Sequence, residues 1–447
     1  MTDQGSIDLR AMATDGKAVR ALSRRRMLQL AAVTGASAFL AACGTAGTRT
    51  PGPSASAGRP SPSGSAPSVG PSATASPSDT ESPVPGASTS PSSEPIQQSR
   101  EPVTGNFRFA NWVGYMDKAP GNRFPTLERF TEETGITVEY SNGAVDDNES
   151  FYTVDLEGPL GVGEPTGWDI VVLTDWMMQR LIAKGWLEQI DTNGLVNYPA
   201  NLLDQYRSRP WDPDNTYAAP WQSGMTGLGF DRAKTGDLDS LEALWDPQFA
   251  GRMTYLSEMR DTVGLSALRL GFDPAALTQD QYDQAVAEVQ RAVDEGLVRQ
   301  LAGNSYVDVM DLGDAVLAIA WSGDVQGLLV PDQATDQDFV WVLAREGGMI
   351  WTDNMGIPKG AQNKAQAEAW IDFYYRPEVA AVVEAWVNYV CPVKGAAEEM
   401  LRLDPALAEN IFIFPTEEMR ARLHEFVSVD LDTAALWEEA FNDAIGL

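Results

Sequence analysis

Residues 106–112 read Asn-Phe-Arg-Phe-Ala-Asn-Trp, and from this point apolar side chains recur at the spacings of regular secondary structure. Apolar and polar side chains alternate from Phe107 onward, which indicates a strand, and Phe124–Thr134 then has the pattern of an amphipathic helix. The apolar runs Ile136–Tyr140 and Asp169–Leu173 indicate two further strands. Strands that alternate with helices are typical of an α/β fold with mostly parallel sheets.

The same alternation continues through the rest of the chain. Further extended segments are predicted at Arg252–Leu256, Val316–Trp321, Phe339–Ala344 and Met355–Pro358. Further helices are predicted at Met177–Lys184, Thr262–Leu270, Gln279–Glu295, Lys364–Tyr375 and Val379–Val387. The sequence has no internal repeat of the length that solenoid and propeller proteins show, so those architectures are excluded.

The chain is strongly acidic. Its 447 residues include 63 Asp and Glu against 32 Lys and Arg, for a formal net charge of −31. Such a surface repels nucleic acid and anionic lipid and attracts cations, so we expect no nucleic-acid partner. Acidity by itself is equally consistent with a role in solubility or with a general bias of the organism's proteins.

The N-terminus has the layout of an export signal. The arginine cluster Arg24-Arg25-Arg26 precedes the mildly apolar run Leu28–Ala42, which is too short for a stable membrane span. The run ends in Leu40-Ala41-Ala42-Cys43-Gly44, which resembles the bacterial lipobox, whose cysteine is lipidated and becomes the new N-terminus. We expect residues 1–42 to be a signal peptide of the twin-arginine type and Cys43 to carry the lipid. The general export route is the alternative.

Residues 43–105 have the composition of a disordered linker. They are dominated by Ser, Pro, Gly, Ala and Thr and contain almost no large apolar residues. Such a segment cannot bury enough apolar surface to offset its ordering entropy. As a flexible chain it would span roughly 40 Å, enough to tether a globular part to a membrane.

Cysteine and histidine are scarce, with 2 Cys and 1 His in the whole chain. With Cys43 assigned to the anchor, Cys391 has no second cysteine for an intramolecular disulfide, and its apolar neighbours predict a small buried thiol. A zinc cluster of Cys and His cannot form, and a Ser-His-Asp or Cys-His mechanism would depend on His424 alone. We expect a structural role for His424 and neither a metal nor a cofactor.

Local sequence motifs are more informative about function than the composition is. In chain order they are Asn111-Trp112-Val113-Gly114-Tyr115, Trp168-Asp169-Ile170-Val171-Val172, Tyr217-Ala218-Ala219-Pro220-Trp221, Ile319-Ala320-Trp321-Ser322-Gly323, Glu346-Gly347-Gly348-Met349-Ile350-Trp351-Thr352-Asp353, Tyr375-Arg376-Pro377-Glu378-Val379-Ala380 and Tyr389. This collinear series, over residues 106–445, resembles the spermidine/putrescine-binding proteins of polyamine ABC transporters.

The resemblance implies an α/β fold of the two-lobed, hinge-linked periplasmic-binding-protein type (type II), preceded by the signal peptide and the linker. The expected first lobe comprises residues 106–226 and 353–390. The expected second lobe comprises residues 227–352 and 391–447.

Three glycines, Gly224, Gly227 and Gly229, lie close together before a strand-like stretch. A phosphate-binding loop would precede a helix, so a nucleotide site is not indicated. We expect a strand that crosses between the lobes, with the glycines absorbing hinge rotation.

The ligand-contacting positions of the family are filled by residues of suitable type. The resemblance assigns ligand contact to Trp112, Tyr115, Thr174, Trp176, Glu258, Asp261, Trp321, Trp351, Asp353 and Tyr389. Two residues depart from the family pattern: Val113 stands where many members carry a hydroxyl, and Trp176 where many carry Tyr. A last contact is expected from the C-terminal segment near His424–Phe426, without an assigned residue.

The residue types suit a polyamine, which is an apolar chain with two or more ammonium groups. Aromatic faces bind ammonium groups and methylenes, and carboxylates form charge-assisted hydrogen bonds with ammonium groups. Asp353 is expected to bind an inner amine, and Glu258 and Asp261 a terminal one. Each residue also has a structural alternative, because aromatic residues are usually core residues, Asp353 could lie in a turn, and Glu258 or Asp261 could cap the helix near Thr262.

The resulting expectation is a substrate-binding lipoprotein on the outer face of the cytoplasmic membrane, in the periplasmic or cell-wall space. It would act as a monomer, bind spermidine or putrescine, and deliver it to the permease and ATPase subunits of an ABC importer without catalysing a reaction. One alternative keeps the fold and changes the ligand to another cationic or zwitterionic metabolite. The other is an exported hydrolase that uses two of the carboxylates Glu258, Asp261 and Asp353.

Overall fold

The computed structural model describes residues 103–324 and 337–446. The predicted signal peptide (residues 1–42), the lipidation site Cys43 and all but the last residues of the predicted linker lie outside the described residues.

The described strands form one sheet with the order β2-β1-β3-β9-β4-β7-β5-β6, in which β10 also pairs with β9 and β8 with β4. The strands are β1 (Gly105–Trp112), β2 (Ile136–Val145), β3 (Ile170–Thr174), β4 (Ala218–Asp231), β5 (Met253–Leu256), β6 (Val298–Ala302), β7 (Leu317–Trp321), β8 (Phe339–Val342), β9 (Gly348–Gly356) and β10 (Leu423–His424).

The pairing is mixed, which corrects the expectation of mostly parallel sheets. The pairs β1–β2, β1–β3, β5–β6, β5–β7 and β9–β10 are parallel. The pairings of β4 with β7, β8 and β9, and that of β3 with β9, are antiparallel. The reason is the chain path: β4 carries the chain out of one half of the sheet and β9 brings it back, so the two strands run in opposite directions.

Helices flank the sheet. The longer ones are α3 (Pro125–Thr134), α6 (Asp175–Ala183), α9 (Met259–Arg269), α10 (Gln279–Asp294), α13 (Lys364–Tyr374), α14 (Pro377–Val387), α15 (Ala396–Leu403) and α18 (Leu431–Ile445). The shorter ones are α4 (Asn148–Phe151), α5 (Gly158–Gly161), α7 (Asn197–Asn201), α8 (Arg232–Thr235), α11 (Tyr306–Asp311), α16 (Pro405–Ala408) and α17 (Glu417–Arg420).

Local sequence explains where several helices begin and end. Helix α3 begins with Pro125, which suits the first helical position, and ends at Gly135, whose φ of 75° closes the last turn. Helix α10 begins with a capping box in which Thr278 and Gln281 satisfy each other's backbone N–H groups. These signals are local, so the sequence predicted both helices closely.

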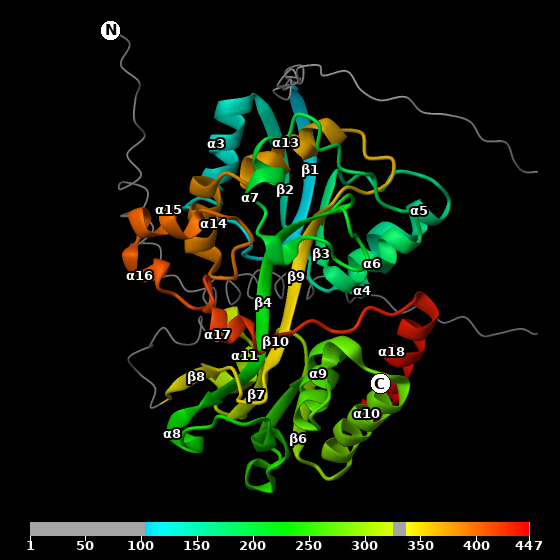
Figure 1. The fold of residues 1–447 in the computed structure, drawn as a ribbon, viewed down its shortest axis with the longest axis vertical. Helices are drawn as coiled ribbons and strands as arrows, with labels where there is room; N and C mark the ends of the chain where they lie inside the picture. The colour runs from blue at the N-terminus through cyan, green and yellow to red at the C-terminus, as the bar shows by residue number, and fades with distance from the viewer. Residues whose placement is uncertain (1–102, 325–336, 447) are drawn as a thin grey trace, which may run out of the picture. The chain divides into compact units, whose positions relative to one another are not determined.

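The long strands β4 and β9 lie side by side and connect two lobes (Figure 1). In the first lobe, alternate residues of β1 and β3 face two apolar layers. One layer contains Phe107, Phe109 and Trp370, and the other contains Val171 and Leu173. Helices α3, α13 and α14 cover the former, and α6 covers the latter.

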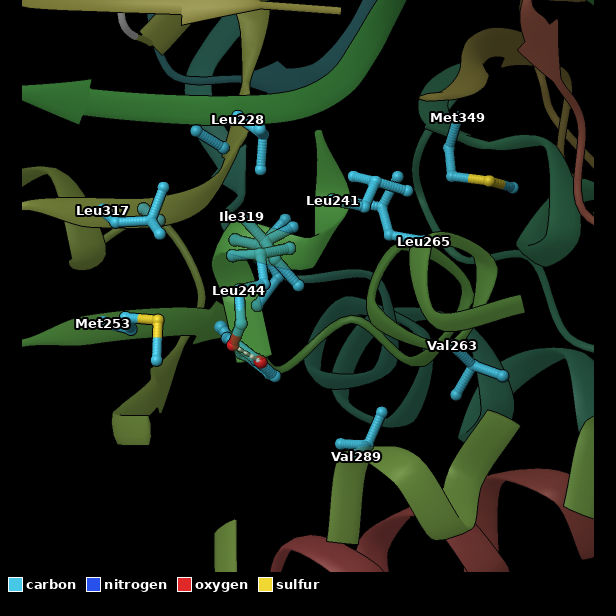
Figure 2. Packing of buried hydrophobic residues seen from close by; sticks show 14 of the residues in the cluster. Leu228, Leu241, Leu244, Met253, Val263, Leu265, Val289, Leu317, Ile319 and Met349 are labelled. Carbon is cyan, nitrogen blue, oxygen red and sulfur yellow. Dashed lines mark hydrogen bonds between the residues drawn. The ribbon is translucent and has the colours of Figure 1, made fainter. Parts of the chain in front are cut away.

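The second lobe has its own core, built on β5, β7, α9 and α10. Figure 2 shows Ile319 of β7 between Leu228 of β4 and Leu244, and Val263 of α9 above Val289 of α10. All five side chains are completely buried. Burial of an aliphatic side chain of this size stabilises the fold by about 1.5–3 kcal/mol. The α/β character and the two cores agree with the expected fold class.

The lobe boundaries remain a prediction, and the packing adds detail to them. The expected boundaries at 226/227 and 352/353 fall inside β4 and β9. The segment 391–447 is divided between the two cores: Cys391, Met400 and Ile413 pack with the first lobe, whereas Trp437 and Phe441 of α18 pack with the second. Helix α15 buries Ala396 and Met400 in the first-lobe core, which accounts for that division.

Across residues 103–324 and 337–446, no helix combines the length and the apolar character needed to cross a membrane.

Candidate functional site: an aromatic box between two lobes

Five of the predicted aromatic residues form a continuous series of ring contacts. The ring centroids of Trp112 and Tyr115 are 6.4 Å apart, and those of Tyr115 and Tyr389 are 5.6 Å apart. The series continues from Tyr389 to Trp351 at 5.5 Å and from Trp351 to Trp321 at 6.2 Å. Trp112 and Trp351 pack with the first-lobe core and Trp321 with the second, so this aromatic box joins the lobes.

Two glycines make room for the box. A Cβ atom on Gly224 of β4 would lie 2.1 Å from the indole of Trp351, and one on Gly323 would lie 2.5 Å from the ring of Tyr389. Neither glycine has a positive φ, so close approach explains them better than backbone freedom does. For Gly224 this indicates a packing role, and the hinge role expected from the sequence stays a prediction.

Asp353 lies in the middle of β9, directly beside Thr174 at the end of β3. The Thr174 hydroxyl donates a 2.8 Å hydrogen bond to Asp353 Oδ1 and accepts one of 2.8 Å from Asn148 Nδ2. Burial raises the pKa of Asp353 to about 7, although hydrogen bonds from Thr174 and Tyr115 favour the ionised form. The structure thus brings Asp353 and Thr174 together with the box, and Asp353 is not in a turn.

Asp261, in the first turn of α9, lies at the other end of the box. It accepts hydrogen bonds from the Thr226 hydroxyl at 2.6 Å and from Trp321 Nε1 at 2.7 Å. The Thr226 hydroxyl also accepts a 3.2 Å hydrogen bond from Trp351 Nε1. Burial raises the pKa of Asp261 to about 6.

Trp176 and Glu258 are placed differently from the other predicted residues. Glu258 caps α9 by accepting a hydrogen bond from the Arg260 backbone, and its carboxylate also forms an ion pair with the Arg260 guanidinium. The same guanidinium lies 4.0 Å from the Trp176 ring centroid. These two residues therefore contact an arginine of the chain itself.

Sequence reasoning missed a charged cluster beside Asp353. Arg209, only 4% exposed, donates to the Thr352 hydroxyl at 3.0 Å and pairs with Glu425 at 3.1 Å. Asp175 lies 4.0 Å from the Arg209 guanidinium and accepts a hydrogen bond from the Thr352 backbone. Arg209 lies in an irregular loop, so no periodic pattern marked it.

Asp175 also affects the two box carboxylates. Burial raises its own pKa to about 6, and its negative charge raises the pKa of both Asp261 and Asp353. The charge of the partly exposed Asp175 therefore disfavours the ionisation of both buried box carboxyl groups. A cation placed among them would relieve that repulsion.

The remaining predictions concern single residues. Cys391 is buried, as expected, and burial raises the pKa of its thiol. His424 lies in β10 and contacts Asp273 at 3.1 Å, which fits the expected structural role. Within the part of the chain that the structure describes, no group of three or more His, Cys, Asp and Glu is arranged to hold a metal ion.

The chain is similar in sequence to relatives of known identity. The spermidine/putrescine-binding periplasmic protein of Escherichia coli (strain K12) is 28% identical over 314 residues, which cover 69% of this chain and 83% of the relative. The putrescine-binding periplasmic protein PotF of the same organism is 27% identical over 330 residues, covering 70% and 84% of the two chains. These relatives agree with the resemblance seen in the sequence motifs.

A solved structure and a family model agree with these relatives. The crystal structure of the spermidine/putrescine ABC transporter substrate-binding protein PotD from Streptococcus pneumoniae superposes with a TM-score of 0.64 at 22% identity. It covers 76% of this chain and 98% of PotD, which confirms the expected type II fold. Residues 126–410 match the family model described as bacterial extracellular solute-binding protein, and the chain belongs to that family.

Proposed function

We propose that this protein is the extracytoplasmic substrate-binding lipoprotein of an ABC importer, and that it binds a polyamine such as spermidine or putrescine between its two lobes. The site consists of the aromatic box (Trp112, Tyr115, Trp321, Trp351 and Tyr389) with Thr174, Asp261 and Asp353. Trp176 and Glu258 lie at its edge.

One observation carries the proposal: a series of five aromatic rings has a buried, protonatable carboxyl group near each end. Asp353 and Asp261 are 2% and 4% exposed, and neither forms an ion pair among the described residues. Aromatic faces and carboxylates are the groups that bind a desolvated ammonium. Because the rings come from both lobes, a ligand in contact with them would favour the closed arrangement.

The direct test is a ligand screen on the full-length protein by calorimetry and thermal shift. Putrescine, spermidine and spermine are compared with control amino acids that carry a carboxylate. We expect saturable polyamine binding and a raised melting temperature. A melting temperature that no polyamine changes would overturn the proposal.

One atom favours a second candidate ligand. Trp112 Nε1 is buried without a hydrogen-bond partner among the described residues. A polyamine offers no acceptor for this N–H, whereas a zwitterionic metabolite with a carboxylate does. Tighter binding of such an amino acid than of any polyamine in the same screen would favour this candidate.

The proposal includes no chemical step, in keeping with a solute-binding family. A hydrolase reading would require two of the carboxylates Glu258, Asp261 and Asp353 to act on a bound substrate. Mass spectrometry of ligand recovered after prolonged incubation tests this point. We expect unchanged ligand, and a cleaved or modified product would contradict it.

The anchor at Cys43 and the partners belong to the proposal as well. A lipid at Cys43 and the linker after it would hold a monomer at the outer face of the cytoplasmic membrane, within reach of a permease and its ATPase. Replacement of Cys43 by Ser should release the protein from the membrane fraction. Retention of this variant in that fraction would contradict lipid anchoring at Cys43.

A further inference from the structure

Arg260 contacts both lobes at the edge of the site. It lies in the first turn of α9 in the second lobe, and its guanidinium carbon is 4.0 Å from the ring centroid of Trp176 on first-lobe helix α6. Its Nη1 atom is 3.0 Å from Glu258 Oε1 and 2.6 Å from Glu438 Oε1 of α18. The Arg260 side chain is only 14% exposed, so it is held in this position on several sides.

These contacts are the ones that an ammonium group of a ligand would make. An ammonium seeks an aromatic face and one or two carboxylates, and Arg260 already takes Trp176, Glu258 and Glu438. Arg180 lies 5.2 Å from the same Trp176 ring, so the ring is near two guanidinium groups. A ligand cation entering here would have to displace a buried, doubly paired arginine.

The aromatic box differs from the surroundings of Arg260, because no cation of the protein lies against its tryptophan rings or pairs with Asp353 among the described residues. Among residues 103–324 and 337–446, no Lys or Arg forms an ion pair with Asp353, and none is recorded over the rings of Trp112, Trp321 or Trp351. Asp353 is stabilised by hydrogen bonds alone at close range, whereas the positive charge of Arg260 also acts to lower the pKa of Asp261, although the two form no ion pair among the described residues.

We propose that Arg260 occupies the place that a distal ammonium group of a long polyamine would take, and that it selects short diamines over triamines and tetraamines. The inference rests on the proposed function. In a diamine, both ammonium groups can lie within the box, near Asp353 and Asp261. In a longer polyamine, a further ammonium group meets the Arg260 guanidinium and is repelled by it.

The experiment compares the dissociation constants for putrescine and spermidine in the wild type and in Arg260→Met, which keeps an unbranched apolar stem and removes the charged guanidinium. We expect the wild type to bind putrescine more tightly than spermidine. We expect Arg260→Met to shift the ratio of the two constants by about tenfold or more toward spermidine, because Glu258 and Glu438 become available to the additional ammonium group.

Arg269→Met is the matched control. Arg269 lies on the same helix, is 15% exposed, and pairs with Glu242 and Glu288. It also lies 4.5 Å from the ring of Trp245, but that ring belongs to the second-lobe core and not to the site. Its replacement should leave the ratio unchanged. Arg260→Lys should retain the diamine preference, because it keeps the positive charge.

Arg260→Met leaves two partly buried carboxylates, Glu258 and Glu438, without their cation and could unfold the protein. The double variant Arg260→Met/Glu438→Gln removes one of these carboxylates and should still shift the ratio toward spermidine, by less than Arg260→Met does, because Glu258 alone remains for the additional ammonium group. A wild type that prefers spermidine, or a folded variant with an unchanged ratio, overturns the role of Arg260. A wild type that binds no polyamine overturns the proposed function instead.

Discussion

Asp353 and Glu258 were both predicted to bind ligand amines, and the structure places them in contrasting surroundings. Burial raises the pKa of Asp353 to about 7, and desolvation raises the pKa of Glu258 as well. Asp353 is held by neutral donors, Thr174 and Tyr115, whereas Glu258 pairs with Arg260. Burial and a raised pKa therefore do not by themselves identify a ligand-binding carboxylate. What matters is whether a cation of the protein already occupies it.

The largest effect on polyamine affinity is expected at Asp353, beside the aromatic box. Asp353→Asn leaves a ligand ammonium without its counter-charge in a desolvated position and should weaken polyamine binding by roughly 30- to 100-fold. Calorimetric titration measures the change. Asp314→Asn, which alters an exposed carboxylate paired with Arg299, serves as the control and should leave affinity unchanged. Wild-type affinity in Asp353→Asn would contradict the placement of the amine.

The same variant should be more stable than the wild type without ligand. With a folded pKa of about 7 against 3.8 unfolded, ionisation of Asp353 opposes folding, so its contribution falls as pH rises from about 4 to about 7. The free energy of unfolding of Asp353→Asn at about pH 8 should exceed that of the wild type by up to about 4 kcal/mol. Urea denaturation of both proteins across pH tests this, and a destabilised variant at high pH would contradict it.

Affinity should depend on pH in the wild type. The ligand binds the carboxylate form, so it lowers the pKa of Asp353 and releases a proton, and affinity should rise with pH up to about 7. Between about pH 7.5 and pH 5.5 we expect a loss of about 10- to 30-fold. Asp261 and Asp175, with pKa values of about 6, should add to the loss at the acidic end. Titrations in Asp353→Asn should show a much weaker dependence, and an equal dependence would assign the proton to another group.

A smaller effect on affinity is expected where Gly224 packs against the Trp351 indole. Gly224→Ala places a methyl group where the Trp351 indole lies and should tilt or displace that ring, with a loss of affinity of about 3- to 10-fold through weakened cation–π contact. Gly161→Ala is the control, because a Cβ on Gly161 meets nothing within 4 Å. Unchanged affinity in Gly224→Ala would mean that Trp351 is not held in place by β4.

The sequence predicted the elements better than it predicted the site. Helix ends such as Gly135 carry local signals, so α3 and α10 were placed closely. Strand β9 was predicted only from Met355, because Thr352 and Asp353 are polar residues buried in a strand and interrupt the apolar pattern. The pairing of Thr174 with Asp353 joins residues 179 apart, which no local pattern contains.

The candidate site residues came from the family resemblance, and the resemblance could not reveal which of them the protein itself occupies. Arg260 lies between the two predicted contacts Glu258 and Asp261. The orientation of its side chain, however, depends on an ion pair with Glu438 of helix α18, which is far along the chain. The roles of Gly224 and Gly323 could not be predicted from local sequence either, because each glycine makes room for an aromatic ring from a distant segment of the chain.

The smallest effect is expected at the arginine end. Glu258→Gln removes a carboxylate that Arg260 already neutralises, and Gln can still accept the hydrogen bond from the Arg260 backbone. Putrescine affinity should therefore change by less than about threefold, because a carboxylate whose charge is already compensated contributes little to binding. Calorimetry with putrescine measures this beside Asp353→Asn under the same conditions. If the two variants lost affinity equally, Arg260 would have to move away from Glu258 when the ligand binds. Glu258 and Asp353 would then both bind ligand amines.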